Sequence, residues 1–488
     1  MKSGARHVPC PLRAAAIASP GAPAVVGPGG ALTYGELDRR VAVAAEGIEE
    51  LGLEAGAHVA LYLSKGERYL ALLLALIRAG CVACPLSTRL PPPRGVAPLL
   101  QTIACRALIS SDEGLLGATD AGIRKLRPER LLAEEPAARD RAQDPEPLRL
   151  ALDRPATLVF TSGSAGAPKA VVHTFGNHYY SALGSNANIA LAPGDRWLHS
   201  LPLYHVGGLS ILFRCLLAAA TVALPQPGDP LGKGIADGGA THVSLVSTQL
   251  LRLLRGKDFE RRGLKAILLG GGPIPPPLVE EATARGLPIH TSYGLTEMAS
   301  QVTATTPGAS REELRTSGRP LPHRAISVSD DGEILVRGET LFAGYVEGEA
   351  VDRPLDADGW FHTGDLGELD ADGYLRVRGR KDNLFISGGE NIQPEEIEEV
   401  LCRLEGVEEA VVVPVPDAEF GSRPVAFVRP AGGKFGDLAQ ALELTLPCFK
   451  IPVAFHEWPG GTREMKLDRA SFRERALRLH REDETGLR

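Results

Sequence analysis

The sequence lacks any hydrophobic run long enough to cross a bilayer, although it has 488 residues. The longest apolar stretch, Tyr69–Ile77, is far shorter than the roughly 20 residues that a membrane-spanning helix needs. No secretory signal pattern follows the first residues, Met-Lys-Ser-Gly-Ala-Arg. These absences predict a cytoplasmic protein without a membrane span.

The sequence also has few cysteines and no excess of positive charge. The 7 cysteines are scattered, which fits a reducing compartment better than a disulfide framework. Cys81 and Cys84 form a Cys-x-x-Cys pair among apolar residues, with no second pair to complete a zinc site, so we expect them to pack in the core. The net charge of −7 lacks the basic excess typical of nucleic-acid binding. Homo-oligomerisation stays open.

The composition, with 44% hydrophobic and 23% charged residues, is that of a globular protein, and the length predicts more than one domain. Strand-like and helix-like segments alternate, for example 58–63 with 67–79. The run 266–269 is another strand, and Thr33 with Glu36 forms the capping-box pattern of a helix start. Alternation of this kind is typical of an α/β fold with a parallel sheet.

Beyond about residue 324 the pattern changes to short strands separated by Asp-Gly pairs, which are hairpin signals. These pairs are Asp331-Gly332, Asp358-Gly359 and Asp372-Gly373. The last hundred residues look self-contained, with a helix over 394–403 and strands over 410–415 and 425–428.

We therefore predict the fold class α/β, with two domains. The large N-terminal domain, residues 1–380, would consist of α/β subdomains plus a β-rich part. The small C-terminal domain, residues 381–488, would be α+β and mobile relative to the large one.

A loop rich in glycine and hydroxyl groups follows the strand-like residues 158–160. Backbone N–H groups, hydroxyls and an ammonium group suit the phosphates of a nucleotide. The Walker order Gly-Lys-Ser/Thr is absent, and a turn of this composition by itself is more often only a turn. The candidate phosphate-binding residues are Thr161, Ser162, Gly163, Ser164, Gly166 and Lys169.

Further polar segments make the nucleotide hypothesis stronger. Ser292–Glu297 follows a predicted strand that ends near His290, and the Glu297 carboxylate is an oxygen ligand of the kind that Mg²⁺ prefers. Asp365, in the tight turn expected at Thr363-Gly364-Asp365, could bind the two hydroxyls of a ribose. Arg380 could reach the same sugar or a phosphate.

In this order, the segments resemble the acyl-adenylate-forming superfamily, which includes acyl-CoA synthetases, peptide-synthetase adenylation domains and luciferases. The resemblance extends from Leu32 to Arg469. Within the superfamily the sequence is most similar to the o-succinylbenzoyl-CoA synthetases of menaquinone biosynthesis. The segments that carry this likeness are 173–178, 201–210, 244–250, 383–396 and 413–421.

The resemblance implies an ATP-dependent carboxylic acid–CoA ligase. A small-molecule carboxylic acid attacks the α-phosphate of ATP, which gives acyl-AMP and pyrophosphate, and the thiol of coenzyme A then attacks the acyl carbon. Mg²⁺ is the implied cofactor, ATP and coenzyme A are co-substrates, and o-succinylbenzoate is the implied acid.

The resemblance also implies roles for individual residues. The 161–169 loop would hold the β- and γ-phosphates, and Thr296 with Glu297 would organise Mg²⁺ and the α-phosphate. Lys466 would bridge the carboxylate and the α-phosphate, and His205 would act as a gate beside the acyl carboxylate. The other implied nucleotide-binding residues are Gly271, Gly272, Pro273, Ser292, Tyr293, Gly294, Asp365 and Arg380.

The small domain is implied to swing about Asp382 between the two steps, which brings Gly388 and Gly389 to the acyl-adenylate. A second carboxylate on the acid would need donors or cations, for which His178 and Arg214 are candidates. The candidate acyl-pocket residues are His178, Ser181, Ser210 and Gln249.

Departures from the family pattern keep alternatives open. Ala165 and Ala170 stand where many members carry Thr and Gly, and Met465 stands where a glycine usually precedes the catalytic lysine, so Lys450 competes with Lys466 for that role. The alternatives are another aryl or medium-chain acyl-CoA synthetase, or a nucleotide-binding paralogue without ligase chemistry.

Overall fold

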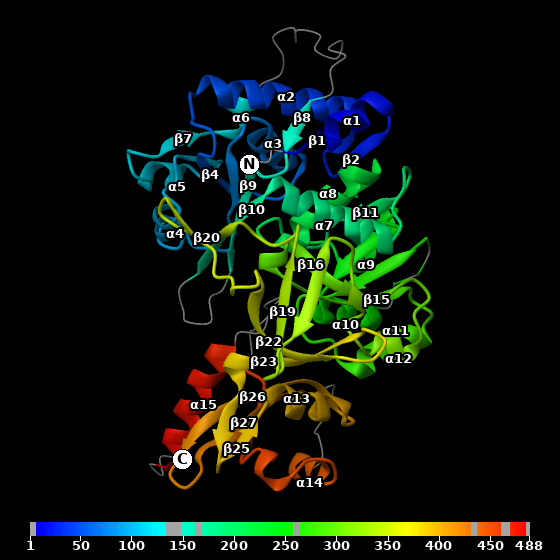
Figure 1. The fold of residues 1–488 in the computed structure, drawn as a ribbon, viewed down its shortest axis with the longest axis vertical. Coiled ribbons are helices and arrows are strands. Elements are labelled where there is room, and N and C mark those ends of the chain that lie inside the picture. Colours follow the sequence, from blue (N-terminus) through cyan, green and yellow to red (C-terminus); the bar gives the residue numbers. More distant parts are fainter. Residues whose placement is uncertain are drawn as a thin grey trace.

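Two bodies of unequal size make up the structure (Figure 1). In this computed structural model, residues 6–132, 148–161, 168–256, 259, 261, 263–430, 437–459 and 469–484 are described. The large body holds the N-terminal part of the chain, and the small body, yellow to red in Figure 1, lies at one end of it. The predicted fold class is confirmed.

The first sheet of the large body has the strand order β21-β20-β10-β9-β5-β4-β6-β7. Strands β9, β5, β4, β6 and β7 run parallel, and β10, β20 and β21 add antiparallel neighbours. The elements of this layer are β4 (His58–Tyr62), α3 (Glu67–Arg78), β5 (Val82–Pro85), α4 (Ala97–Thr102), β6 (Ala107–Ser110), α5 (Glu113–Ala118), β7 (Arg124–Leu126), α6 (Pro128–Leu131), β9 (Pro155–Thr161), β10 (Lys169–Thr174), β20 (Gly344–Glu347) and β21 (Ala350–Asp352).

The second sheet has the order β17-β16-β15-β14-β13-β11-β12-β2-β3, with a parallel centre from β15 to β2. Its elements are β2 (Pro23–Gly27), β3 (Gly30–Thr33), β11 (Arg196–Leu198), β12 (Thr221–Ala223), α9 (Leu231–Asp237), β13 (His242–Leu245), α10 (Ser247–Arg255), β14 (Ala266–Leu269), α11 (Pro276–Ala284), β15 (Ile289–Leu295), η2 (Thr296–Met298), β16 (Ser300–Ala304), α12 (Arg311–Leu314) and β17 (Arg319–Pro320).

Helices between the two sheets provide a shared core. The largest apolar cluster joins Leu61 of the first sheet and Val222 of the second to helix residues such as Leu73 and Leu209. The remaining elements of this layer are β1 (His7–Pro9), which pairs with β8 (Arg149–Ala151), and the helices α1 (Pro11–Ala18), α2 (Tyr34–Glu50), α7 (Phe175–Asn188) and α8 (Val206–Ala218).

An antiparallel sheet, β18-β19-β22-β23, completes the large body. It consists of β18 (Arg324–Val328), β19 (Glu333–Gly338), β22 (Phe361–Leu369) and β23 (Leu375–Arg380). Its apolar core includes Tyr293 and Met298, which come from β15 and η2. The sheet is thereby fixed against the second sheet rather than packed separately.

The small body is α+β, with a sheet of order β26-β27-β28. Its apolar clusters contain Ile397, Val412 and Phe427. Its elements are η3 (Lys381–Asn383), β24 (Phe385–Ser387), β25 (Glu390–Ile392), α13 (Pro394–Arg403), β26 (Val407–Asp417), β27 (Gly421–Pro430), α14 (Leu438–Glu443), η4 (Cys448–Lys450), β28 (Ala454–Glu457) and α15 (Arg469–Glu484).

Several local predictions are confirmed. Helix α2 begins at the predicted capping box, in which Thr33 and Glu36 exchange hydrogen bonds. Strand β14 and helix α13 have the predicted bounds. Cys81 and Cys84 are buried in the core. Within the described ranges, no helix is both long and apolar enough to cross a membrane.

Three predictions need correction. The strand expected to end near His290 continues as β15 to Leu295, because it pairs with β16 over this length. Asp365 lies inside strand β22 at a bulge, not in a tight turn. Asp358-Gly359 closes only an isolated bridge between Leu355 and Phe361, whereas the other two Asp-Gly pairs form true hairpins.

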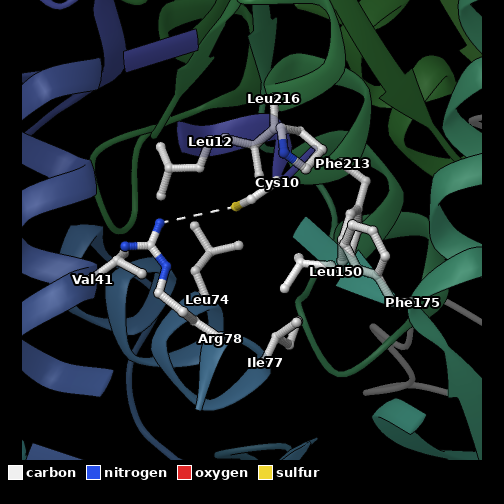
Figure 2. A pocket seen from close by; sticks show the side chains of 11 residues that line it. Cys10, Leu12, Val41, Leu74, Ile77, Arg78, Leu150, Phe175, Phe213 and Leu216 are labelled. Carbon is white, nitrogen blue, oxygen red and sulfur yellow. Dashed lines mark hydrogen bonds between the residues drawn. The ribbon is translucent and has the colours of Figure 1, made fainter. Parts of the chain in front are cut away.

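A small apolar cavity lies among α1, α2, α3 and α8 (Figure 2). Its volume is ≈ 20 Å³, which is room for about one water molecule. Arg78 borders it, and its guanidinium forms an ion pair with Asp38 and lies 4.0 Å from Cys10 Sγ. The cavity is too small to hold a substrate.

Buried histidines predict that the stability of the large body depends on pH. Burial lowers the pKa of His173 to about 4 and that of His199 to about 3, and it holds the pKa of His178 well below its usual range. In the unfolded chain these histidines bind a proton near pH 6.5, whereas in the folded chain they stay neutral at that pH. Their contribution to the free energy of unfolding is therefore complete above about pH 6.5 and is lost as the pH falls toward the folded pKa values.

We expect urea to unfold the protein more easily at about pH 5.5 than at about pH 7.5, a range in which ordinary carboxylates do not titrate. His199→Gln removes one buried titratable group. It should reduce the slope of the free energy of unfolding against pH by up to about 1.4 kcal/mol per pH unit. Equal free energies of unfolding at the two pH values would contradict this explanation.

Candidate active site

Asp365, Arg380 and Tyr293 form the first cluster of predicted nucleotide-binding residues. Strands β22 and β23 pair in a register that places Asp365 opposite Arg380. Arg380 Nη1 donates to Asp365 Oδ1 over 2.9 Å, and the Tyr293 hydroxyl donates to Oδ2 over 2.6 Å. One carboxylate thus joins two sheets of the large body.

The bulge in β22 explains how Asp365 reaches this position. Gly364 has a φ of +71°, in the left-handed region that a side chain disfavours. Arg380 Nη1 also donates to the Thr363 carbonyl over 2.9 Å, next to the bulge. A bulge re-aims side chains, and here the Asp365 carboxylate accepts the hydrogen bond from Arg380.

Burial keeps the Tyr293 hydroxyl protonated. Its pKa lies well above the usual range, first because of burial and then because of the Asp365 charge. The phenol therefore acts as a hydrogen-bond donor to Asp365 and leaves the carboxylate as the acceptor.

Glu297 and Lys169 meet around a residue that the motifs did not predict, Tyr345 of β20. The Tyr345 hydroxyl donates to Glu297 Oε1 over 2.7 Å, and Lys169 Nζ lies 4.9 Å from the centre of the Tyr345 ring. Burial, followed by the Glu297 charge, raises the pKa of Tyr345. Tyr345 also packs against the apolar cluster that contains Tyr293, the donor to Asp365, so the two polar clusters share one core.

The phosphate-loop residues that the structure describes lie at the ends of a hairpin. Thr161 ends β9 and Lys169 begins β10, and the two are register partners. Four predicted phosphate-binding residues of the loop lie outside the described residues, namely Ser162, Gly163, Ser164 and Gly166.

Several predicted nucleotide-binding residues lie at the carboxyl ends of parallel strands, where α/β sheets commonly bind ligands. Gly271, Gly272 and Pro273 form an exposed loop after β14. The Pro273 carbonyl accepts a hydrogen bond from Ser247 over 2.6 Å, and Ser292 of β15 donates to the carbonyl of Leu269 over 2.7 Å.

Gly294 and Thr296 extend the same edge toward Glu297. A side chain at Gly294 would collide with the backbone of Ser300, so the close pairing of β15 and β16 requires glycine. The Thr296 carbonyl lies 2.7 Å from Nε2 of the buried His173.

The residues predicted to line the acyl site have different environments. His205 is exposed at the start of α8, with its ring 4.7 Å from that of Tyr204. Ser210 is buried and donates to the Gly207 carbonyl. Gln249 accepts the Val246 N–H with its side-chain oxygen.

His178 lies in the core of the large body. It is 1% exposed, its ring stacks on Phe213 at 4.5 Å, and its Nε2 lies 2.7 Å from Thr157 Oγ1. Burial, followed by the charge of His173, lowers its pKa, so it is a neutral side chain at physiological pH.

Two buried arginines surround Gln301 beside helices α7 and α8. Arg214 Nη2 donates to Gln301 Oε1 over 2.7 Å, and Arg324 Nε donates to the Gln301 carbonyl over 2.6 Å. Arg324 Nη2 also donates to Ser181, another predicted acyl-pocket residue. Among the described residues, no carboxylate forms an ion pair with either arginine.

The arginine charges are costly in this environment. Arg214 is 1% exposed and Arg324 is 9% exposed. Burial lowers the pKa of Arg214 to about 10, and burial together with the charge of Arg214 lowers that of Arg324 to about 9. An anion nearby would offset this cost.

The predicted hinge residue contacts the Asp365 cluster, whereas the glycines predicted for the coenzyme A step lie in the small body. Asp382 is exposed and accepts a hydrogen bond from Arg380 Nη2 over 3.1 Å. Gly388 and Gly389 form the turn between β24 and β25, where the Gly388 N–H donates to Phe420. Figure 1 places β25 toward the outer end of the small body. Lys466 lies outside the described residues.

Glu297 fits a metal that takes most of its ligands from phosphate. No group of three or more acidic, histidine or cysteine side chains in the described part of the chain could hold an ion by itself. Mg²⁺ in nucleotide sites usually binds through one or two carboxylates plus phosphate oxygens. Oε1 of Glu297 accepts the Tyr345 hydroxyl, and Oε2 would be the oxygen that Glu297 offers to such a metal.

Sequence reasoning missed Tyr345 and Arg324. Tyr345 lies 48 residues after Glu297, and Arg324 lies 143 residues after Ser181. No local motif marks them, because only the folded chain brings each to its partner. An unpaired arginine inside a strand of small and apolar residues was the one available signal for Arg324.

Comparisons with known proteins agree with this arrangement. Residues 12–346 match the AMP-binding enzyme family, and residues 396–459 match the AMP-binding enzyme C-terminal domain. The 2-succinylbenzoate–CoA ligase of Oceanobacillus iheyensis is 34% identical over 442 residues, which cover 88% of this chain and 90% of the relative.

Solved structures agree over nearly the whole chain. The o-succinylbenzoate CoA synthetase (MenE) of Bacillus subtilis in complex with the acyl-adenylate intermediate OSB-AMP has a TM-score of 0.84 at 32% identity, covering 96% of this chain and 98% of that chain. The same enzyme in complex with ATP and magnesium ion has a TM-score of 0.83 at 32% identity, covering 95% and 99%. The chain therefore belongs to the AMP-binding enzyme family, within the acyl-adenylate-forming superfamily that its motifs resemble.

Proposed function

We propose that this protein is an ATP-dependent acid–CoA ligase of menaquinone biosynthesis. It converts o-succinylbenzoate, coenzyme A and ATP to o-succinylbenzoyl-CoA, AMP and pyrophosphate through an acyl-AMP intermediate. The observation that carries the proposal is a pair of polar clusters on one apolar core. Asp365 pairs there with Tyr293 and Arg380, and Glu297 and Lys169 contact Tyr345. The full-length likeness to enzymes named for this reaction supports it.

Adenylation must bring two anions together, so the site has to neutralise charge before the reaction begins. Asp365 is oriented by Tyr293 and Arg380 and accepts the ribose hydroxyls. Lys169 supplies a mobile positive charge to the phosphates. Mg²⁺, when bound at Glu297, adds positive charge along the phosphate chain.

The acyl carboxylate must approach the α-phosphate on the line opposite pyrophosphate. We assign to Lys466 the task of bridging these two groups, since a long side chain with a point charge suits a bridge that forms and breaks. His205, exposed at the start of α8, acts as the gate beside the acyl group.

Thioester formation needs access for a thiol where Lys466 acted before. We propose that the small domain, residues 381–488, rotates about Asp382 relative to residues 1–380 and brings Gly388 and Gly389 to the acyl-adenylate. We also propose that the enzyme works in the cytoplasm, where ATP and coenzyme A are available.

The buried arginines favour a dicarboxylic acid as substrate. Arg214 and Arg324 place two positive charges in the core, and the acidic side chains described in the structure do not pair with them. The second carboxylate of o-succinylbenzoate would offset that charge, and a benzoate or a medium-chain fatty acid has no such group. His178 and Ser181 lie on α7 beside this cluster.

We expect the purified protein to release pyrophosphate from ATP with o-succinylbenzoate and to form the CoA thioester when coenzyme A is added. A panel of acids should show lower kcat/KM for benzoates, cinnamates and medium-chain fatty acids. Faster turnover of one of those acids would refute the assigned substrate and leave the ligase chemistry intact. A protein that binds ATP and shows no pyrophosphate exchange with any acid would be a non-catalytic paralogue.

Arg214→Gln should raise the KM for o-succinylbenzoate at least about tenfold, because it removes a charge-assisted partner of the second carboxylate. The KM for ATP should change less than about twofold, since Arg214 lies outside the nucleotide clusters. Arg214→Lys keeps the charge and should restore part of the affinity. An equal loss with a monocarboxylic acid would show that Arg214 does not act through the second carboxylate.

Lys466→Ala should slow adenylation by about a hundredfold or more and affect thioester formation from pre-made acyl-AMP far less. The matched control is Lys450→Ala, because Lys450 already pairs with Glu396 at 2.5 Å. Rapid measurement of each half-reaction separates the two steps. If Lys450→Ala suppresses adenylation and Lys466→Ala does not, the assignment of the two lysines must be exchanged.

A further inference from the structure

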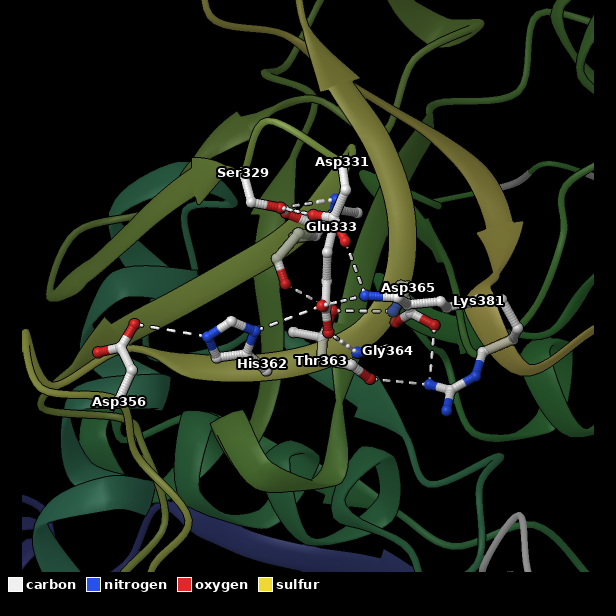
Figure 3. A network of polar contacts seen from close by, with 11 residues as sticks. Ser329, Asp331, Glu333, Asp356, His362, Thr363, Gly364, Asp365 and Lys381 are labelled. Atoms are coloured by element: carbon white, nitrogen blue, oxygen red, sulfur yellow. Dashed lines mark hydrogen bonds and ion pairs between the residues drawn. The ribbon is translucent and has the colours of Figure 1, made fainter. Parts of the chain in front are cut away.

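Glu333 lies outside the predicted motifs, and its buried carboxylate contacts residues within them or next to them. It begins β19, and its side chain is 8% exposed. Oε1 accepts the Gly364 N–H over 2.9 Å, and Oε2 accepts Lys381 Nζ over 3.0 Å. Figure 3 shows this carboxylate at the centre of the network.

Each partner of Glu333 is a direct neighbour of a functional residue. Gly364 precedes Asp365, the proposed ribose ligand, and Lys381 lies between Arg380 and the proposed hinge residue Asp382. The buried Glu333 carboxylate therefore fixes the backbone of Gly364 and the side chain of Lys381. Gly364 lies in β22, and Lys381 begins η3 directly after the end of β23.

The contacts suit a charged carboxylate. His362 Nδ1 lies 3.3 Å from Oε2, and the opposite ring nitrogen lies 3.4 Å from Asp356. Burial acts to raise the pKa of Glu333, and hydrogen bonds from its partners outweigh burial, so that the pKa lies below its usual range. A buried carboxylate that accepts several charge-assisted hydrogen bonds holds its partners firmly.

Asp331 offers an internal comparison. It also accepts Lys381 Nζ, over 2.8 Å, and its side chain is 59% exposed. Exposed ion pairs contribute little because water screens them. Asp331 therefore shares one partner with Glu333 and lacks both the burial and the Gly364 contact.

We propose that Glu333 is a positioning residue that fixes the ribose-binding carboxylate of Asp365 and the hinge at Asp382 relative to each other. The inference rests on the proposed function and goes beyond it, since Glu333 acts through Gly364 and Lys381 and touches neither nucleotide nor acid. Because Lys381 is tied to β19, rotation of the small domain starts at Asp382 and leaves Arg380 in place on Asp365.

The test is Glu333→Gln, which keeps an acceptor for the Gly364 N–H and removes the charge that holds Lys381. We expect AMP to bind about tenfold more weakly and the KM for ATP to rise by a similar factor. The KM for the acid should stay within about twofold, because the substitution disturbs only the nucleotide side. A purely structural defect would instead move the thermal midpoint and both KM values together.

Asp331→Asn is the matched control and should leave AMP binding and both KM values within about twofold of the wild type. Lys381→Met tests the connection in a double-mutant cycle. If Glu333 acts through Lys381, adding Lys381→Met to Glu333→Gln should weaken AMP binding little further, although Lys381→Met alone weakens it.

Three outcomes would overturn the inference. They are an effect of Glu333→Gln no larger than that of Asp331→Asn, equal increases in the two KM values, and fully additive effects of Glu333→Gln and Lys381→Met. Failure of the proposed function is recognised separately. A wild type that binds AMP and activates no acid refutes the ligase. AMP binding by Glu333→Gln and by Asp331→Asn can then still be compared, and that comparison decides the role of Glu333. A wild type that does not bind AMP refutes both.

Discussion

The structure depends on the pairing of Asp365 with Tyr293 and Arg380. The carboxylate is largely buried, and a buried charge is tolerated only where hydrogen-bond donors surround it. Its donors come from β15 of the second sheet and from β23 of the antiparallel sheet. The requirement to satisfy this one charge thus ties the proposed ribose position to the relative placement of two sheets.

The same electrostatic rule, with the sign reversed, describes the proposed acid site. At Asp365 a negative charge is matched by an arginine and a phenol, so the cluster is balanced before any ligand binds. At Arg214 and Arg324 the positive charge is held by Gln301 and by backbone carbonyls, which are neutral. A balanced cluster suits a neutral sugar, and an unbalanced one suits an anion. The two halves of the site therefore differ in the charge they leave for their ligands.

How well the sequence predicts the fold and the candidate site depends on how far apart along the chain the interacting residues lie. The start of α2 and the bounds of β14 and α13 depend on signals within a few residues, and these predictions are confirmed. The continuation of β15 to Leu295 depends on pairing with β16, and the bulge at Gly364 depends on β19, so neither is visible locally. Motifs likewise point to Asp365 and Glu297 as candidates and give no sign of Tyr345 and Glu333, which contact the candidates or their neighbours from other strands.

Arg380 connects the proposed ribose site to the small domain. Its side chain pairs with Asp365, and its backbone carbonyl accepts a hydrogen bond over 3.1 Å from Gln393, which directly precedes α13. A ligand shifts a conformational equilibrium only by its difference in affinity for the two states. Because Asp365 and Glu333 contact the residues on both sides of this carbonyl, a nucleotide at the proposed site would favour the orientation in which Gln393 reaches it. The proposed rotation of the small domain would have to break this contact, which couples the proposed hinge to the proposed ribose site.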